Sequence, residues 1–329
     1  MTTRISRMMI GTAALLFSTG AAFAETIVIG HFGDPTPMNA ARAEGKFEEA
    51  TGWDIEFRKF ASGTDVIAAM ASGDVVLSEL GSSPLAIATS QGVEVQMFML
   101  SYAIGESESL IARNGSDIET LEDLKGKRVA VPVGSTAHFS LMGALDHAGI
   151  DESELTIMNM PPDQIAAAWE QDAIDAAFIW QPVQNRILEN GSRLAGADKT
   201  AEWGFPTFNA WVVGSDFAAE NEEALVAFAR VMDEANHAYI SDRAAWTPDS
   251  APVKAIANET GAAAEQVPEI LEGYTFIPLS EQLSDTWLGN AAETIKATAA
   301  FLEKAGRIDG LADDYSAFVN MKIAEEAEK

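Results

Sequence analysis

The chain contains no cysteine and has few basic residues. The absence of Cys from all 329 residues excludes zinc–thiolate sites, iron–sulfur clusters, disulfides and thiol catalysis. Lys and Arg total 21 against 50 Asp and Glu, which gives a formal net charge of −29. Nucleic acids and anionic membrane surfaces both require a basic face, so the composition argues against either as a partner. The length suggests about two domains.

Histidine is scarce too, and the motifs of common catalytic centres are missing. The four His have no close spacing that would hold a metal, and no Gly-x-Ser-x-Gly motif is present. We therefore expect no metal, no cofactor and no catalytic residue. The four are His31, His138, His147 and His237.

Residues 1–24 have the three regions of a cleaved signal peptide. Arg4 and Arg7 form a positive start, residues 8–17 are mostly apolar, and Ala22-Phe23-Ala24 gives the small-x-small cleavage pattern. The order of these regions favours a signal peptide over a buried N-terminal helix. No later run reaches 18 apolar residues, so we expect a soluble, exported chain that begins at Glu25.

The rest of the chain alternates between short apolar runs and helical patterns. This alternation predicts an α/β fold with mostly parallel, doubly wound sheets. After the last predicted strand the chain reads as almost wholly helical to Lys329. The predicted strands cover residues 26–30, 54–60, 75–80, 93–100, 109–112, 128–133, 155–158, 176–180 and 210–213.

Three turns between a predicted strand and a helix share one chemistry. They are Ser62-Gly63-Thr64, Gly81-Ser82-Ser83 and Gly134-Ser135-Thr136. Each offers a Gly for close approach, hydroxyl donors and the unpaired N–H groups of a helix N-terminus. Each single turn could also be an ordinary helix cap. Together they predict an anion site of neutral donors, suited to a sulfonate, a sulfate or a carboxylate.

Longer motifs carry a resemblance to a known family. Gly81–Ala86 reads Gly-Ser-Ser-Pro-Leu-Ala, Gly126–Pro132 reads Gly-Lys-Arg-Val-Ala-Val-Pro, and Ser135–Leu141 reads Ser-Thr-Ala-His-Phe-Ser-Leu. With these motifs, the chain resembles the periplasmic taurine- and aliphatic sulfonate-binding proteins of ABC importers. The resemblance covers about residues 26–320. It also rests on Ala167–Trp169, on Asp175 with Trp180 and Pro182, and on Trp203-Gly204 followed by Trp211–Val213.

The resemblance implies a type II periplasmic-binding-protein fold. Lobe 1 would comprise residues 25–108 plus 213–329, and residues 109–212 would form an inserted lobe 2. Two such lobes close over one ligand about a hinge. The implied function is capture of taurine or a related small sulfonate and its delivery to an ABC permease with an ATPase subunit. The protein would be periplasmic, monomeric and not an enzyme.

The turns and the resemblance together give ten candidate ligand-binding residues. Two turns, one from each lobe, would hold the anion together with a His in the first turn of the following helix. The other candidates would surround the rest of the ligand. The ten are Ser82, Ser83, Ser135, Thr136, His138, Phe32, Glu108, Trp180, Trp203 and Asn209.

Several of these candidates also have ordinary structural interpretations. Glu108 could be a solvated loop acid, and His138 could lie on a helix surface. Large aromatic residues such as Trp180 and Trp203 usually belong to a core. Trp203 lies outside any periodic run, which makes it the better of the two as a pocket wall.

The sequence departs from taurine-binding relatives where an ammonium group would be bound. Those relatives usually carry an acid at the positions of Thr36 and Asn209, and Phe32 stands in place of a Gln. Glu108 remains. A desolvated ammonium needs carboxylate or aromatic partners, so these changes leave the exact ligand open. The alternatives are a neutral-tailed or N-acylated sulfonate, a sulfate ester, or an exported enzyme with the same bilobal fold.

Overall fold

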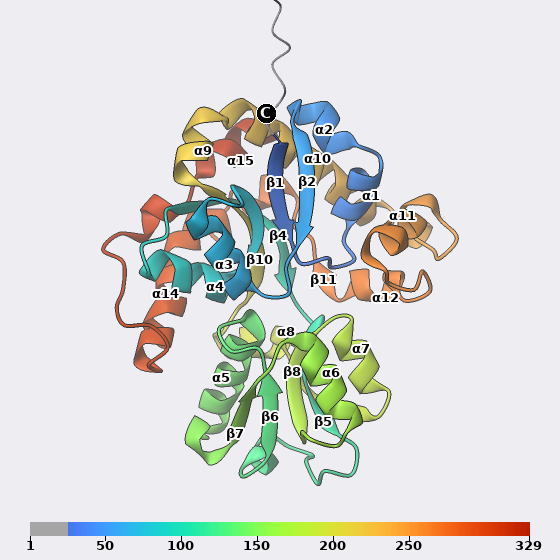
Figure 1. Cartoon of the computed structure of the whole chain (residues 1–329), viewed down its shortest axis with the longest axis vertical. Coiled ribbons are helices and arrows are strands. Elements are labelled where there is room, and N and C mark those ends of the chain that lie inside the picture. Colours follow the sequence, from blue (N-terminus) through green and yellow to red (C-terminus); the bar gives the residue numbers. More distant parts are fainter. Residues whose placement is uncertain (1–25) are drawn as a thin grey trace, which may run out of the picture.

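The computed structural model describes residues 26–329, so the predicted signal peptide lies outside the described residues. It contains two β-sheets, each flanked by helices, one above the other in Figure 1. Within residues 26–329, no helix has both the length and the apolar character needed to cross a membrane.

The first sheet has six strands in the order β11-β4-β10-β3-β1-β2. It combines strands from the start of the chain with two that follow the second sheet in sequence. The strands are β1 (Thr26–His31), β2 (Asp54–Lys59), β3 (Leu77–Gly81), β4 (Val95–Ile104), β10 (Phe208–Gly214) and β11 (Tyr274–Thr275).

The second sheet has five strands in the order β7-β6-β8-β5-β9. All of them come from the middle of the chain. They are β5 (Glu108–Arg113), β6 (Arg128–Val131), β7 (Thr156–Asn159), β8 (Ala176–Trp180) and β9 (Gly191–Gly196).

Most strands of each sheet run in one direction, which confirms the predicted α/β class. In the first sheet β10 is antiparallel to both β3 and β4, so β1, β2, β3 and β4 share a direction. In the second sheet β5 alone is reversed. Two strands were not expected from the sequence. β9 begins and ends with Gly and includes polar residues, and β11 has two residues, so neither shows an apolar pattern.

The strand pairing indicates where the chain crosses from one lobe to the other. The predicted boundaries are 108/109 and 212/213. All of β5 from Glu108 pairs in the second sheet, and all of β10 from Phe208 pairs in the first. We therefore propose that the chain crosses between the lobes at residues 105–107 and 203–207.

Helices cover the faces of both sheets (Figure 1). Those that accompany the first sheet are α1 (Pro37–Ala43), α2 (Lys46–Thr51), α3 (Gly63–Ser72), α4 (Ser82–Ser90), α9 (Ser215–Glu220), α10 (Glu222–Ser241), α11 (Ala251–Thr260), α12 (Val267–Glu272), α13 (Leu279–Gln282), α14 (Ala291–Lys304) and α15 (Met321–Glu328). Those that accompany the second are α5 (Thr136–Ala148), α6 (Pro162–Glu170), α7 (Val183–Leu188) and α8 (Ala197–Glu202). Short 3-10 helices cover Glu122–Leu124, Glu152–Glu154, Arg243–Ala245, Leu288–Asn290 and Tyr315–Phe318.

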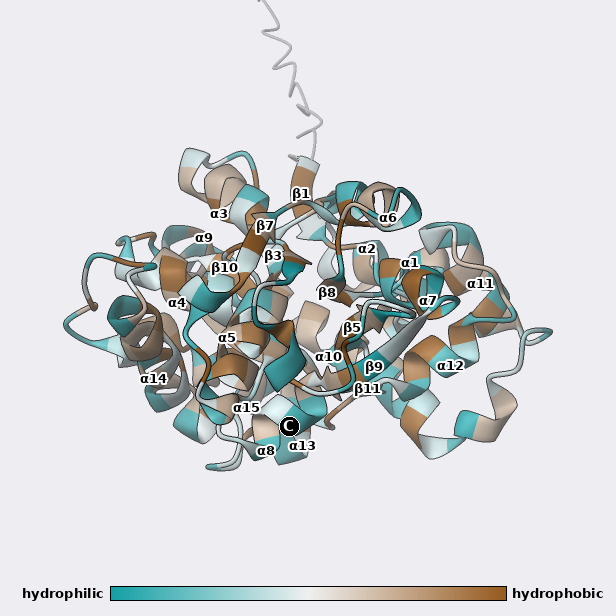
Figure 2. Ribbon diagram, turned by 90° about the horizontal axis from the view of Figure 1, so that it is seen from below, coloured by the Kyte–Doolittle hydropathy of each residue, from teal (hydrophilic) through white to brown (hydrophobic). Residues whose placement is uncertain are grey.

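The long helix α10 shows how the helices pack on the sheet. Its buried residues Leu225, Phe228, Met232, Asn236 and Tyr239 recur three or four positions apart, which places them on one face. In Figure 2 the helices carry hydrophobic and hydrophilic segments side by side, as amphipathic helices do.

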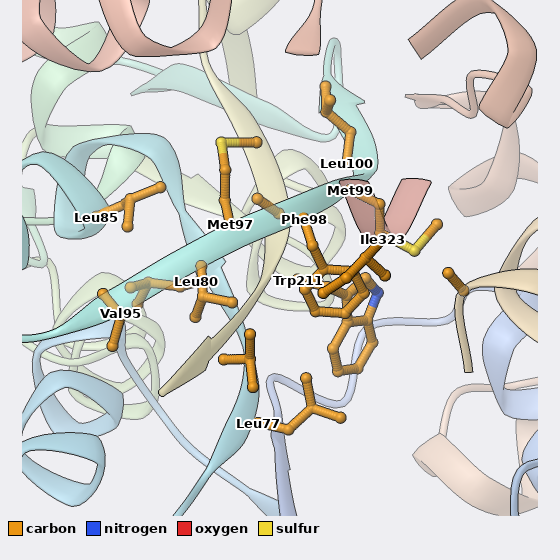
Figure 3. Close-up of a cluster of buried hydrophobic side chains, with 14 of the residues drawn as sticks. Leu77, Leu80, Leu85, Val95, Met97, Phe98, Met99, Leu100, Trp211 and Ile323 are labelled. Atoms are coloured by element: carbon orange, nitrogen blue, oxygen red, sulfur yellow. The ribbon is translucent and has the colours of Figure 1, made fainter. Parts of the chain in front are cut away.

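The largest core lies between the first sheet and its helices. Trp211 of β10 is fully buried and meets Phe228 of α10 edge-on, with 4.9 Å between ring centroids. Figure 3 shows Trp211 beside Phe98, whose ring also meets Phe228 edge-on. Burying one large apolar side chain contributes about 1.5–3 kcal/mol, so this cluster stabilises the packing of α10 on the first sheet.

Candidate functional site

A cavity lies between the two sheets, and about 430 Å³ within it and at its open mouth is free of protein atoms. Most of its residues lie at or just beyond strand ends that face the other sheet. The lining residues are Phe32, Asp34, Gly63, Gly81, Pro84, Tyr102, Ile104, Ser107, Glu108, Ser135, Thr136, Trp180, Asn209 and Tyr274.

The strand directions explain why these distant residues meet. The parallel strands of each sheet end at one edge, and ligands of open α/β sheets bind at such an edge. Phe32 follows β1, Gly81 ends β3, and Ser135 follows β6. Because β5 and β10 run in the opposite direction, it is their first residues, Glu108 and Phe208-Asn209, that reach the same edges.

Three helices begin at the cavity wall. Gly63 opens α3, Gly81 precedes α4, and Ser135 caps α5 by accepting a hydrogen bond from the backbone N–H of His138 at 3.2 Å. The first N–H groups of a helix have no intrahelical partner and carry partial positive charge. The Ser83 Oγ, in the first turn of α4, is buried and has no hydrogen-bond partner among the described residues. The helix N-termini at the cavity wall are hydrogen-bond donors of the kind that anions accept from, and they need no basic side chain to do so.

Two carboxyl groups reach the cavity from opposite sheets. Asp34 follows β1 and accepts a hydrogen bond from the Tyr102 hydroxyl at 2.6 Å. Glu108 begins β5, and its Oε1 accepts a hydrogen bond from the Thr136 hydroxyl. Its other oxygen, Oε2, is buried and unpartnered among the described residues. Of the described residues that line the cavity, none is Lys, Arg or His.

Burial makes both carboxyl groups hard to ionise. Desolvation raises the pKa of Glu108 from 4.5 to about 8; the Thr136 hydrogen bond opposes this shift and the nearby charge of Asp34 adds to it. Desolvation likewise raises the pKa of Asp34 from 3.8 to about 6, against the lowering effects of the Tyr102 hydrogen bond and of Lys59. A cation placed between them would favour the ionised form of both.

Tyr102 links the Asp34 carboxyl group to strand β10 through hydrogen bonds. Its hydroxyl donates to Asp34 and accepts a hydrogen bond from the Asn209 side-chain amide at 2.6 Å. The Tyr274 ring packs against the Tyr102 ring with 4.3 Å between centroids. The Asp34 carboxyl is therefore held in place by a chain of groups on the first sheet.

The two lobes touch at the mouth of the anion site. A Cβ added at Gly81 would lie 2.7 Å from Cγ2 of Thr136, and one at Gly134 would lie 3.4 Å from Cγ2 of Thr64. Glycine at position 81 thus permits the close approach of β3 to α5. The structure is a closed arrangement of the lobes.

A second contact between the lobes lies away from the cavity. Arg307, just after α14, pairs with Glu152 at the start of the segment leading to β7. Phe139 of α5 meets Phe301 of α14 edge-on at 5.4 Å between centroids, and Phe205 packs against both. These contacts also hold the lobes together.

The structure brings six of the ten predicted site residues to the cavity. The other four, Ser82, Ser83, His138 and Trp203, do not line it. The six are Phe32, Glu108, Ser135, Thr136, Trp180 and Asn209.

Ser82, Ser83 and His138 lie behind the cavity wall. The Ser82 hydroxyl accepts a hydrogen bond from the backbone N–H of Phe208 at 3.4 Å and so helps to hold the start of β10. His138 is buried on α5, where its Nδ1 accepts a hydrogen bond from the Gly134 N–H at 3.3 Å. Burial, with a smaller effect from Arg307, lowers its pKa from 6.5 to about 4, so the ring is neutral at neutral pH. It supports the turn rather than facing the cavity.

Trp203 is not among the residues that line the cavity. It follows α8, is half-buried, and stacks on the ring of His147, with 4.1 Å between centroids and 3° between planes. It was predicted as a pocket wall, but here its ring contacts α5 through His147. Trp180, at the end of β8, takes the wall position instead.

Several lining residues were not predicted from the sequence, above all Asp34. The resemblance placed a missing acid at Thr36, before Pro37, but the acid of this chain precedes Pro35 two residues earlier. Thr36 is buried and accepts a hydrogen bond from Asn39. The Asp34-Pro35 pair after a strand was an available signal. The other missed residues are Tyr102, Ile104, Ser107, Tyr274 and Pro84, whereas the lining residues Gly63 and Gly81 belong to two of the predicted turns.

Metal ligands are not gathered at this site. Across residues 26–329, no group of three or more His, Asp or Glu is placed to hold a metal ion. The chemistry of the cavity is that of two carboxyl groups, hydroxyls, helix N-termini and aromatic rings.

Comparisons with known proteins agree on one family. The family described as NMT1/THI5 like matches residues 33–244. The taurine-binding periplasmic protein of Escherichia coli (strain K12) is 36% identical over 313 residues, covering 95% of this chain and 97% of that protein.

Solved structures show the same fold at lower identity. The alkanesulfonate-binding protein SsuA from Xanthomonas axonopodis pv. citri, bound to MOPS, aligns with a TM-score of 0.74 and 20% identity over 90% of this chain and 98% of that one. The desulfurization enzyme DSZB aligns with a TM-score of 0.66 and 12% identity over 92% and 99%. At these identities the likeness shows the fold alone.

Proposed function

The chain belongs to the NMT1/THI5-like family, together with its taurine-binding periplasmic relative, and from this premise we propose that it captures taurine or a close amino-sulfonate for an ABC importer. One observation carries the choice of ligand. Asp34 and Glu108 line the same cavity as three helix N-termini, and no basic residue is among the described lining residues. A short zwitterion with an ammonium at one end and a sulfonate at the other matches this distribution of charge.

The anion end of the ligand would meet backbone and hydroxyl donors. The N–H groups at the start of α4 and α5, with the Ser135 hydroxyl, would hold the sulfonate oxygens, while the Thr136 hydroxyl keeps its hydrogen bond to Glu108. Hydrogen bonds from neutral donors to a charged group contribute about 1.5–3 kcal/mol each, so several can hold an anion without Arg or Lys.

The ammonium end would lie between the two carboxyl groups. Glu108 Oε2 has no partner among the described residues and can accept from the ammonium, and Asp34 faces the same space from the other lobe. The rings of Phe32, Trp180 and Tyr274 supply apolar walls. Because the two acids belong to different lobes, both contacts form only when the lobes are closed, so the ligand favours closure.

A calorimetric comparison of four ligands tests this proposal. Taurine should bind more tightly than isethionate, ethanesulfonate or an N-acyl taurine, since it alone pairs with both acids. Asp34→Asn should lower taurine affinity by about a hundredfold or more, the usual effect of removing one partner of a buried charge pair. Asp216→Asn, an exposed acid on α9, serves as the matched control. Tighter binding of a neutral-tailed sulfonate would refute the amino-sulfonate assignment.

We further place the protein in the periplasm as a monomer that delivers its ligand to a permease and its ATPase subunit. The relative's description as periplasmic and the predicted signal peptide support the location. N-terminal sequencing of the exported protein should give Glu25 as its first residue. Uptake of labelled taurine should be lost when the gene is deleted and restored when it is returned.

An enzymatic function on the same fold is the second possibility to test. DSZB shares the architecture but is only 12% identical, which supports no statement about chemistry. Incubation with sulfonates or sulfinates should release no sulfite above the blank. Release that depends on the protein would overturn the binding-protein proposal.

A further inference from the structure

Glu79 is a third buried acid near the cavity, although it does not line it. It lies on β3, two residues before Gly81, and is 3% exposed. Its Oε1 accepts a hydrogen bond from the Ser101 hydroxyl at 2.6 Å, and Ser101 directly precedes Tyr102. The Phe32 backbone N–H also donates to it. Phe32 lines the cavity and Ser101 is next to the lining residue Tyr102, so both contacts place the carboxyl group directly behind the cavity wall.

The charged and titratable groups around Glu79 come from every neighbouring element. Asp34 follows β1, Tyr102 and Tyr274 come from β4 and β11, and their charges interact with that of Glu79. His31 ends β1, one residue after Gly30, which pairs with Ser78 of β3, and its ring contacts Arg42 of α1. Lys59, at the end of β2, is exposed and acts on Asp34. No basic side chain among the described residues forms an ion pair with Glu79.

We propose that Glu79 is a positioning residue of the ligand site, whose carboxylate acts through Asp34 and Tyr102 to select ligands with a positively charged end. This inference rests on the proposed function. Asp34, Glu79 and Glu108 lie in or next to one cavity, and none of them has a basic ion-pair partner among the described residues, so the positive end of a ligand would favour their ionised forms.

Proton release should accompany binding if this is correct. Burial, with a smaller contribution from Asp34, raises the pKa of Glu79 from 4.5 to about 8, so the free protein holds a proton there at neutral pH. An ammonium group in the cavity favours the carboxylate and expels that proton. Taurine affinity should therefore rise with pH up to about 8, a range in which a primary amine stays protonated. Isethionate, which has no cation, should not show this rise.

The variant Glu79→Gln separates this role from a structural one. Gln keeps the size and the hydrogen bond to Ser101, so packing alone should leave binding unchanged. We expect a loss of about tenfold in taurine affinity at pH 8 or so, little change for isethionate, and a smaller rise in affinity from about pH 6 to about pH 8. Calorimetry in two buffers of different ionisation enthalpy counts the protons released. Glu49→Gln, an exposed acid on α2, is the matched control.

The outcomes distinguish this inference from the proposed function. If the wild type binds taurine and Glu79→Gln changes neither the taurine-to-isethionate ratio nor its pH dependence, the inference alone is overturned. If the wild type binds isethionate but not taurine, both fall. Should Glu79→Gln fail to fold, Ser101→Ala carries the test, because loss of the donor should move the rise in taurine affinity to higher pH. An unmoved rise in that variant would also overturn the inference.

Discussion

Replacing Glu108 with Gln should make the protein more stable and a poorer taurine binder. The carboxyl group is buried, accepts a hydrogen bond from Thr136 and has no ion-pair partner among the described residues. Its pKa is raised from 4.5 to about 8 by burial. A raised pKa means that its contribution to stability is fully present below pH 4.5 and is lost as the pH rises toward about 8.

The size of the effect follows from the same shift. A pH of 7 lies about 2.5 units above the ordinary Glu pKa of 4.5. Over that interval the folded protein loses about 1.4 kcal/mol of stability for each pH unit, because Glu108 is ionised in the unfolded chain but still protonated in the folded one. Ionisable Glu108 therefore costs the folded protein about 3 kcal/mol, and Gln removes this cost while it keeps the acceptor for Thr136. Taurine loses one of its two carboxylate partners and should bind about a hundredfold more weakly, since an ammonium would be left poorly paired.

Two measurements check the prediction. Urea unfolding without ligand should give Glu108→Gln a higher free energy of unfolding than the wild type at pH 7, and nearly the same value below pH 4.5. Calorimetry should show the taurine-to-isethionate affinity ratio collapse in the same variant. If Glu108→Gln is less stable at pH 7, the acid is a structural group and the reasoning is refuted. An unchanged ratio would show that Glu108 does not contact the amine end.

Three further predictions concern closure and pH. Gly81→Ala should prevent full closure and lower affinity for every sulfonate, because its Cβ would lie 2.7 Å from Thr136 Cγ2; adding Thr136→Ser, which removes that methyl group, should restore most of the binding by calorimetry. Arg307→Gln should remove the ion pair with Glu152 and increase the radius of gyration of the ligand-free protein in small-angle scattering. The effect on stability should stay below about 1 kcal/mol, because both side chains are about a third exposed. An unchanged radius of gyration would contradict this prediction. Because the pKa of His138 is lowered to about 4, its contribution to stability should be present above pH 6.5 and lost as the pH falls toward 4. In His138→Gln, the free energy of unfolding measured in urea should fall less steeply between pH 6.5 and about 4.

The α/β class could be predicted because it depends on local pattern. Apolar runs of four to seven residues gave most strands, and the turns Gly81-Ser82-Ser83 and Gly134-Ser135-Thr136 correctly marked two helix starts at the cavity. Strands without an apolar pattern, such as β9, were missed for the same reason. Residues that end a strand or cap a helix are specified by their immediate neighbours.

The surroundings of Asp34 depend on contacts between residues that are far apart in the sequence, and such contacts cannot be predicted from local sequence patterns. Asp34, Tyr102 and Asn209 are far apart in the chain, and they meet because β4 extends to Ile104 and β10 returns antiparallel beside it. Asp34 faces the cavity while Thr36, two residues on, is turned into the fold. The sequence determined which segments become strands and helix starts, since these follow from periodicity and capping. Only the tertiary structure decided which side chains share the cavity and which acids are deprived of water, because both depend on how the two sheets face each other.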